Sequence, residues 1–334
     1  MKFPSRLMRS WIGAFGLMAG AFGQTYVQFS SGPTIFPTSI NEKDEIAGWY
    51  SDPGAPPHSD SRGFVRDAGG RITTLDVPGS SNTQAASIND EGAITGTYIV
   101  PSGSEHGYVR DREGNFTTFD PPGSINTIPL SINAAGAVTG DYQDSNNVYH
   151  GFVRRADGTL IPFDAPGSIA TQPLSINAKG AIAGSYQDAK GAWHGFVRRP
   201  WGEVVSFDVL GSTQTTPESI NDPGTITGYY VAANGRFFGF VRDSQGKFTS
   251  FDLGFSTVPT SINDEGWITG TYQSVSEAHG FVRSPDGTIT SFDPPFCSPS
   301  RSLTAPTSIN NEGVITGRCS AAGSNAPVGW VRYP

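Results

Sequence analysis

The chain has few charged residues and no long hydrophobic run. Charged residues make up only 16% of its 334 positions, and 42 Gly and 25 Pro would interrupt helices, which excludes a helical bundle or coiled coil as the main architecture. The net charge of −8, without a basic run beyond the extreme N-terminus, argues against a protein that follows nucleic-acid phosphates. A hydrophobic content of 36%, including 21 Phe, is enough to fill a core, so we expect a folded, turn-rich chain.

The N-terminus has the pattern of an export leader. Three basic residues among the first nine positions precede an apolar stretch at residues 11–22, which ends in the small-residue pattern Ala-Phe-Gly. We expect a signal peptide at residues 1–23 and a single secreted or periplasmic domain at residues 24–334; a short buried N-terminal helix is the alternative. No later stretch approaches the roughly 18 apolar residues that cross a membrane, so we expect no membrane span.

Internal repetition dominates the sequence. Three blocks recur at steps of about 44 residues: Ser-Ile-Asn and Gly-aromatic-Val-Arg, each present seven times in strict alternation, and Phe-Asp or a variant, present six times. Ser-Ile-Asn begins at Ser39, Ser87, Ser131, Ser175, Ser219, Ser261 and Ser308. The second block begins at Gly63, Gly107, Gly151, Gly195, Gly239, Gly280 and Gly329, and the third ends at Asp76, Asp120, Asp164, Asp208, Asp252 and Asp293.

Each repeat predicts four short strands, which we call a, b, c and d. In one repeat they are residues 127–133, 137–142, 150–154 and 160–164, rich in β-branched and aromatic residues and without a sustained helical period. Asn-x-x-Gly between a and b, and a Gly-containing turn between c and d, favour tight hairpins. The repeat is therefore a four-stranded antiparallel meander with the length of a β-propeller blade.

The missing seventh Phe-Asp block indicates how the ring closes. Residues 25–29 match strand d, and the chain ends after a strand c, so the N-terminal strand can complete the last blade and hide both sheet edges. An open β-solenoid would leave its terminal strands unpaired or require caps. We therefore expect an all-β, seven-bladed β-propeller with four antiparallel strands per blade, closed by the N-terminal strand.

The repeated blocks resemble a known family. His-Gly-Phe-Val-Arg, followed by Ser-Ile-Asn-x-x-Gly-x-Ile-x-Gly, is similar to the extracellular HAF repeats of secreted bacterial proteins, with Gly in place of Ala. The resemblance covers essentially all of residues 24–334 and implies an extracellular repeat protein, and it brings no established catalytic residues. Three repeats lack the histidine and have Arg62, Phe238 and Val328 in its place.

The repeated charged residues predict structural roles. The four histidines of the repeats occupy different blades and cannot converge within about 2.0–2.1 Å of one ion, so we expect each to hydrogen-bond a strand backbone or nearby loop instead of a metal. The arginines that end strand c are expected to form ion pairs with the Asp ring one strand away, with an anion-binding surface as the alternative. The histidines are His106, His150, His194 and His279, and the arginines are Arg66, Arg110, Arg154, Arg198, Arg242, Arg283 and Arg332.

The two cysteines both stand where the last repeat departs from the others. Cys297 lies in a lengthened connection from d to a, and Cys319 replaces the Tyr that ends strand b elsewhere. We predict a disulfide between them, worth on the order of 3 kcal/mol for a loop of about 20 residues; two free thiols are the alternative.

Only one face of such a ring can vary, and it is the face that carries the b–c and d–a connections. In three consecutive repeats the residue before the His position is aromatic: Tyr149, Trp193 and Phe237. These residues are our candidate ligand-binding arc, because flat amphipathic rings suit sugar or protein partners; covering the rim of the core is the alternative. We expect a monomeric recognition or scaffold module that binds an extracellular carbohydrate or protein partner and no nucleic acid.

An enzyme is the second hypothesis, as a propeller lyase or hydrolase acting on an extracellular polymer. The clearest break in the repeat is residues 52–60, where His58 would act as base and Asp60 as its orienter, although no nucleophile or metal set accompanies them. Asp144-Ser-Asn-Asn lacks the ligand count of a calcium loop, and no phosphate-binding Gly loop or nucleophile elbow is present. We expect no cofactor and no metal; a purely structural repeat protein is the third hypothesis.

Overall fold

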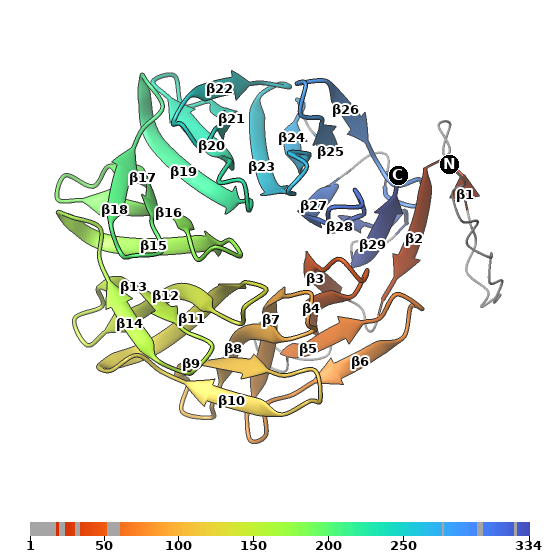
Figure 1. Cartoon of the computed structure of the whole chain (residues 1–334). Helices are drawn as coiled ribbons and strands as arrows, with labels where there is room; N and C mark the ends of the chain where they lie inside the picture. Colours follow the sequence, from red (N-terminus) through yellow and green to blue (C-terminus); the bar gives the residue numbers. More distant parts are fainter. Residues whose placement is uncertain are drawn as a thin grey trace, which may run out of the picture.

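The described chain folds as a ring of four-stranded antiparallel units (Figure 1). The computed structural model describes residues 18–19, 24–30, 34–51, 61–275, 277–298, 303–323 and 326–334. Every regular element in these ranges is a β-strand, and none of the described residues forms a helix long and apolar enough to cross a membrane. The architecture is all-β and propeller-like, as the repeats predict.

The strands follow one another in the predicted order a, b, c, d. The first units are β3–β6 (Thr34–Ile40, Ile46–Ser51, Ser61–Arg66, Ile72–Leu75), β7–β10 (Asn82–Ile88, Ile94–Ile99, Glu105–Arg110, Phe116–Phe119) and β11–β14 (Ser124–Ile132, Val138–Asp144, Tyr149–Arg154, Leu160–Phe163). Next come β15–β18 (Ser168–Ile176, Ile182–Asp188, Trp193–Arg198, Val204–Phe207) and β19–β22 (Ser212–Ile220, Ile226–Ala232, Phe237–Arg242, Phe248–Phe251). β23–β26 (Ser256–Ile262, Ile268–Gln273, Ala278–Arg283, Ile289–Phe292) and β27–β29 (Ala305–Ile309, Ile315–Ser320, Pro327–Tyr333) follow.

The N-terminal strand completes the last unit, as predicted. β2 (Thr25–Phe29) pairs antiparallel with β29, in a register that sets Thr25 opposite Tyr333 and Phe29 opposite Gly329. The two strands lie side by side where the ends of the chain meet in Figure 1. A two-residue strand, β1 (Met18–Ala19), pairs with β2 from within the predicted leader; the rest of residues 1–23 lies outside the described residues.

The Ser-Ile-Asn block does more than form the turn between strands a and b, because its side chains also hydrogen-bond the neighbouring unit. Asn133 Nδ2 donates to the backbone carbonyl of Asn177 at 2.9 Å, and the backbone N–H of Ile176 donates to Ser131 Oγ at 3.3 Å. The asparagine bond recurs from unit to unit and returns to the start, where Asn310 donates to the carbonyl of Asn41 at 3.2 Å. Its donors are Asn41, Asn89, Asn133, Asn177, Asn221, Asn263 and Asn310.

Strand b approaches strand a too closely for any residue but glycine at one position. Strand β11 shifts register between Pro129 and Ser131, which brings its backbone onto Gly140 of β12. A Cβ at Gly140 would overlap the carbonyl oxygen of Ile128 and lie 2.8 Å from Cα of Pro129. The same close approach occurs at Gly48, Gly96, Gly184, Gly228, Gly270 and Gly317.

Six of the seven arginines that end strand c pack against an aromatic ring of the preceding unit; for Arg110 that unit has Leu75 at the position of the ring. Arg154 Cζ lies 5.2 Å from the ring centroid of Phe119, and Nη1 donates to the backbone carbonyl of Arg155 at 3.3 Å. The same cation–π arrangement places Arg66 on Phe29, Arg198 on Phe163, Arg242 on Phe207, Arg283 on Phe251 and Arg332 on Phe292. The structural role is therefore as expected, but the predicted ion pairs with the Asp ring are wrong, because these guanidiniums stack between units.

Candidate binding site on the loop face

The two faces of the ring differ in how much they vary. The a–b and c–d turns all lie on one face and are tight: Gly136 N–H donates to Asn133 O and Gly158 N–H to Arg155 O, each at 2.9 Å, and the other units repeat the pattern. Even where Asp44 replaces the turn glycine, it adopts the same left-handed conformation, with φ of 59°.

The b–c and d–a connections lie on the opposite face, which we call the loop face. Several of them are also tight turns, as where Gly191 N–H donates to Asp188 O at 3.0 Å, but their lengths differ between units, whereas all a–b and c–d turns have the same length.

The Asp ring lies on the loop face, and its partners are the histidines. His106 Nδ1 is 2.8 Å from Asp120 Oδ2, and the same pairing joins His150 to Asp164, His194 to Asp208 and His279 to Asp293. In two units without the histidine, an arginine pairs with the Asp instead. Arg62, at the His position, lies 2.6 Å from Asp76, and Arg236, two residues before the His position, lies 2.7 Å from Asp252. The histidines thus hydrogen-bond a nearby loop, the d–a connection of their own unit, as one of the two expectations has it, and the partner is a carboxylate and not a strand backbone.

Around His194 the carboxylates change the acidity of the ring. Burial lowers the pKa of His194, but hydrogen bonds to and charges of Asp208 and Asp188 outweigh burial and leave the pKa above its ordinary value. Within the described ranges, no three His, Cys, Asp or Glu side chains gather in a way that would hold a metal ion. These pairs therefore explain why the blocks carry His and Asp without requiring a ligand.

The three aromatic residues of the predicted arc begin strands β13, β17 and β21 on the loop face, and each is half-buried. The Trp193 and Phe237 backbones bridge to the next unit at Gln214 and Ser256. The Phe237 ring packs 5.4 Å from Tyr229, and no ring contact among the described residues joins Tyr149, Trp193 and Phe237 to one another. The arc is thus a set of separate, partly covered rings. His58 and Asp60 lie outside the described residues.

A pocket of about 370 Å³ opens on the loop face beside the ring closure. Its walls come from strand ends and connections of the β23–β26 unit, the β27–β29 unit and β3, and they are mainly apolar. Its lining includes Phe36, Ala278, Leu303, Arg318, Cys319 and Pro327. This volume is within the range of small-molecule sites.

Sequence reasoning missed this pocket, although the repeats contain a signal for it. The residue after the strand-b glycine lies opposite a residue of strand a, and this cross-strand pair differs in every unit. The pairs are Phe36–Trp49, Gln84–Thr97, Ile128–Asp141, Gln172–Ser185, Thr216–Tyr229, Val258–Thr271 and Ala305–Arg318. Four residues from these pairs meet in the pocket: Phe36, Thr271, Ala305 and Arg318.

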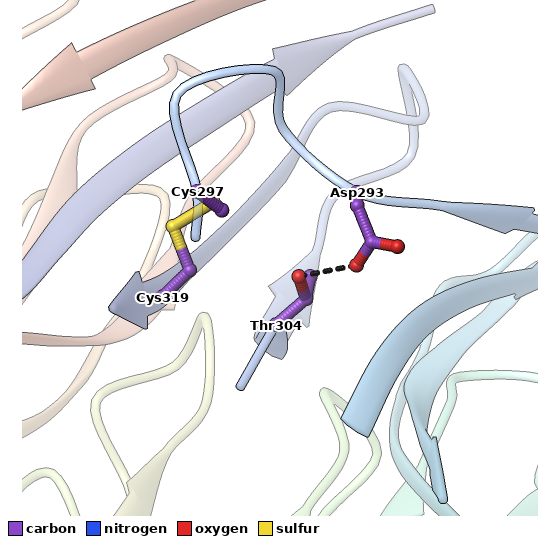
Figure 2. Close-up of a disulfide and its surroundings, with 4 residues drawn as sticks. All are labelled: Asp293, Cys297, Thr304 and Cys319. Carbon is purple, nitrogen blue, oxygen red and sulfur yellow. Dashed lines mark hydrogen bonds between the residues drawn. A yellow bond between two sulfur atoms is a disulfide. The ribbon is translucent and has the colours of Figure 1, made fainter. Parts of the chain in front are cut away.

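The predicted disulfide is confirmed and stiffens one wall of the pocket. Cys297 and Cys319 are bonded, with Cα atoms 5.8 Å apart, and both are buried. Figure 2 shows the bond between the d–a connection and the end of β28, next to the hydrogen bond from Thr304 to Asp293. The crosslink fixes the connection beside Arg318, because Cys319 is the next residue in β28.

Asp141, from one of the variable pairs, is buried with an exposed fraction of only 4%. Burial raises the pKa of its carboxyl from 3.8 to about 7. The folded chain therefore holds this proton more tightly than the unfolded chain does, so the contribution of Asp141 to stability falls as pH rises from about 4 to about 7.

We expect Asp141→Asn to stabilise the protein at pH 8, by on the order of 2 kcal/mol, and to leave its stability nearly unchanged at pH 4, where the native carboxyl is already neutral. Urea unfolding of both proteins at the two pH values measures this difference. Asp144→Asn on the same strand is the matched control, because turn hydrogen bonds lower the pKa of Asp144 and its replacement should not stabilise the protein. An equal gain at both pH values would contradict a buried, titrating Asp141.

A second hollow, of about 190 Å³, lies on the ring axis at the tight-turn face. Its acidic residues cap backbone N–H groups of their neighbours: Asp222 N–H donates to Asp264 Oδ1 at 2.8 Å, and Glu42 N–H to Asp90 Oδ1 at 2.9 Å. Burial raises the pKa of Glu42. These hydrogen bonds give the acidic residues a structural role around the axis.

Comparison with known proteins identifies the fold and no more. No family model matches the chain, and no curated protein matches it. Among solved structures it is similar to a streptogramin B lyase, with 15% identity and a TM-score of 0.62 over 93% of this chain and 98% of that one. It is also similar to the β-propeller domain of the trilobed protease from Pyrococcus furiosus, with 9% identity and a TM-score of 0.63 over 89% and 95% of the two chains.

A third similar structure is a puromycin hydrolase, with 9% identity and a TM-score of 0.63 over 86% of this chain and 50% of that one. At these identities the likeness shows a β-propeller fold, which is shared by proteins named as a lyase, a protease and a hydrolase. The activity of this chain must therefore be argued from its own residues.

Proposed function

We propose that the chain is an exported recognition module that binds a carbohydrate or protein partner on the loop face and acts as a monomer. The observation that carries the proposal is the contrast between the faces: all a–b and c–d turns have the same length, whereas the b–c and d–a connections of the loop face differ in length between units and border a pocket of about 370 Å³. A site that distinguishes ligands needs such local differences on a constant scaffold.

The proposal includes seven blades and membership of the HAF-repeat family. The blade number is supported by the seven Ser-Ile-Asn blocks and by contacts between successive innermost strands, which run from β3 through β7, β11, β15, β19 and β23 to β27 and back to β3. Export of residues 24–334 is supported by the leader pattern and by a disulfide, which is stable in oxidising compartments.

The other two hypotheses have less support. The enzyme hypothesis depends on His58 and Asp60, which lie outside the described residues, and turnover unchanged by His58→Ala and by Asp60→Ala would contradict a catalytic role for them. A purely structural role does not explain why the loop face varies while the scaffold stays constant.

The test is a binding screen of residues 24–334 against glycans and cell-wall polysaccharides, with a Tyr149→Ala, Trp193→Ala, Phe237→Ala triple variant alongside. We expect saturable binding to the native chain and at least a tenfold loss in the triple variant, because each ring removed takes away a stacking surface. Isothermal titration calorimetry on the best ligand measures both affinities.

The control is Trp201→Ala. Trp201 lies in a c–d turn on the tight-turn face with 71% of its surface exposed, so its removal should not change binding. Equal losses in Trp201→Ala and in the triple variant would contradict binding on the loop face, and full binding by a folded triple variant would contradict the arc.

A further inference from the structure

Arg318 differs from the arginines that build the ring. Six of the seven that end strand c stack on a Phe, and most of the seven also donate to the next backbone carbonyl, as Arg154 does. Arg318 lies in strand b, where the other units have neutral residues or Asp141, and its guanidinium forms no ion pair or hydrogen bond within the described part of the chain. Its guanidinium Cζ lies 4.4 Å from the ring centroid of Phe36.

This unpaired charge is half-buried at the pocket wall. Burial alone lowers the pKa of Arg318, and no described carboxylate offsets the lost hydration. Because Arg318 lines the pocket, an anion that enters it can reach the guanidinium, and the planar fork of arginine matches two oxygens of a carboxylate. The site thus offers one strong anchor of defined charge.

The surroundings of the anchor are apolar and stiff. Phe36 stacks on Trp49 with ring centroids 3.9 Å apart, and Ala278, Leu303 and Pro327 supply further apolar wall. The disulfide at Cys319 and the bridge between Ala278 and Leu303 hold the wall in place. A volume of about 370 Å³ admits a ring-sized body beside the carboxylate.

We infer that this pocket binds a small organic carboxylate with an apolar, ring-sized body, whose carboxylate pairs with Arg318 and whose body packs against Phe36. The inference rests on the proposed function only in taking the loop face as the binding side. A sugar acid carries the same charge, but its hydroxyls would lose water against apolar walls, so the observations favour the apolar acid.

The experiment uses residues 24–334 and four probes at pH 7.5: 1-naphthylacetate, its neutral counterpart 1-naphthylacetamide, acetate and glucuronate. We expect 1-naphthylacetate to bind at least tenfold more tightly than each of the other three in calorimetric titrations, because only this probe has both the charge and the apolar body. Comparable binding of the amide or of glucuronate, or no binding of 1-naphthylacetate, would overturn the inference without any variant.

Arg318→Met tests the anchor, since it keeps the length of the side chain and removes the charge. We expect at least a tenfold loss of 1-naphthylacetate affinity, and no change for Arg71→Met, which replaces an exposed arginine in a c–d turn. Unchanged affinity in a folded Arg318→Met would overturn the role of Arg318. Should that variant not fold, Arg318→Lys keeps the charge without the fork and is expected to bind severalfold more weakly than the native chain.

The outcomes also separate this inference from the proposed function. The triple aromatic variant should keep its affinity for 1-naphthylacetate, and Arg318→Met should keep its affinity for any polysaccharide held by the arc. Binding of 1-naphthylacetate without binding of any glycan would support a carboxylate site in the pocket and contradict glycan binding by the aromatic arc.

Discussion

Gly140→Ala is expected to destabilise the protein more than any other single substitution considered, by about 4 kcal/mol or more. The added methyl would overlap the carbonyl oxygen of Ile128 and press on Cα of Pro129, and both are backbone atoms held in the β11–β12 pairing. Backbone cannot rotate away as a side chain can, so the strands must separate and lose hydrogen bonds. Thermal unfolding should show a decrease in Tm of roughly 10 °C or failure to fold.

The matched control is Gly69→Ala in an exposed c–d turn. There an added Cβ meets only the exposed Asp67 side chain, 3.3 Å from Oδ1, which can shift by a few tenths of an ångström while it accepts the Arg71 N–H, so we expect a change within about 0.5 kcal/mol. Similar stability of the two variants would contradict the close approach of strands a and b.

Much of the fold could be predicted because its signals are local. The Asn-x-x-Gly turns and alternating blocks define the meander, and residues 25–29 were identifiable as the closing strand because they repeat a pattern. The boundaries differ slightly: β11 begins at Ser124 and not at residue 127, since the d–a connection already pairs with β12 there. The disulfide was predictable because both cysteines stand at departures from the repeat.

Contacts between units could not be predicted in the same way. In each repeat the Phe-Asp block follows the strand-c arginine by one strand, so the sequence offers both residues as partners for the arginine. Only the stacking of successive units decides that Arg154 contacts Phe119 of the preceding unit, while Asp164 of its own unit contacts His150. The pocket has the same origin, because Phe36 and Arg318 lie near opposite ends of the chain and meet only when the ring closes. The sequence shows that these positions vary, but not that they converge.

The second large effect is expected for Asn133→Ala. Its Nδ2 donates to the buried carbonyl of Asn177, and its Oδ1 accepts from the Ala137 N–H, each at 2.9 Å. Alanine leaves the Ala137 N–H without its partner and removes one of the two donors to the Asn177 carbonyl, which keeps the Gly180 N–H at 2.9 Å. An unsatisfied buried group costs about 1–3 kcal/mol and a lost hydrogen bond about 1 kcal/mol, so we expect a loss of about 2–3 kcal/mol in urea unfolding.

Two further variants show whether this loss comes from the bond between units. Asn133→Asp keeps the acceptor for the Ala137 N–H but removes the donor and sets a carboxylate against the Asn177 carbonyl, so it should lose at least as much stability as Asn133→Ala. Asn146→Ala removes an exposed asparagine from the same unit and should cost less than about 0.5 kcal/mol. If Asn133→Asp were as stable as the native chain, the asparagine would serve only its turn, and the bond between units would contribute nothing to holding the ring together.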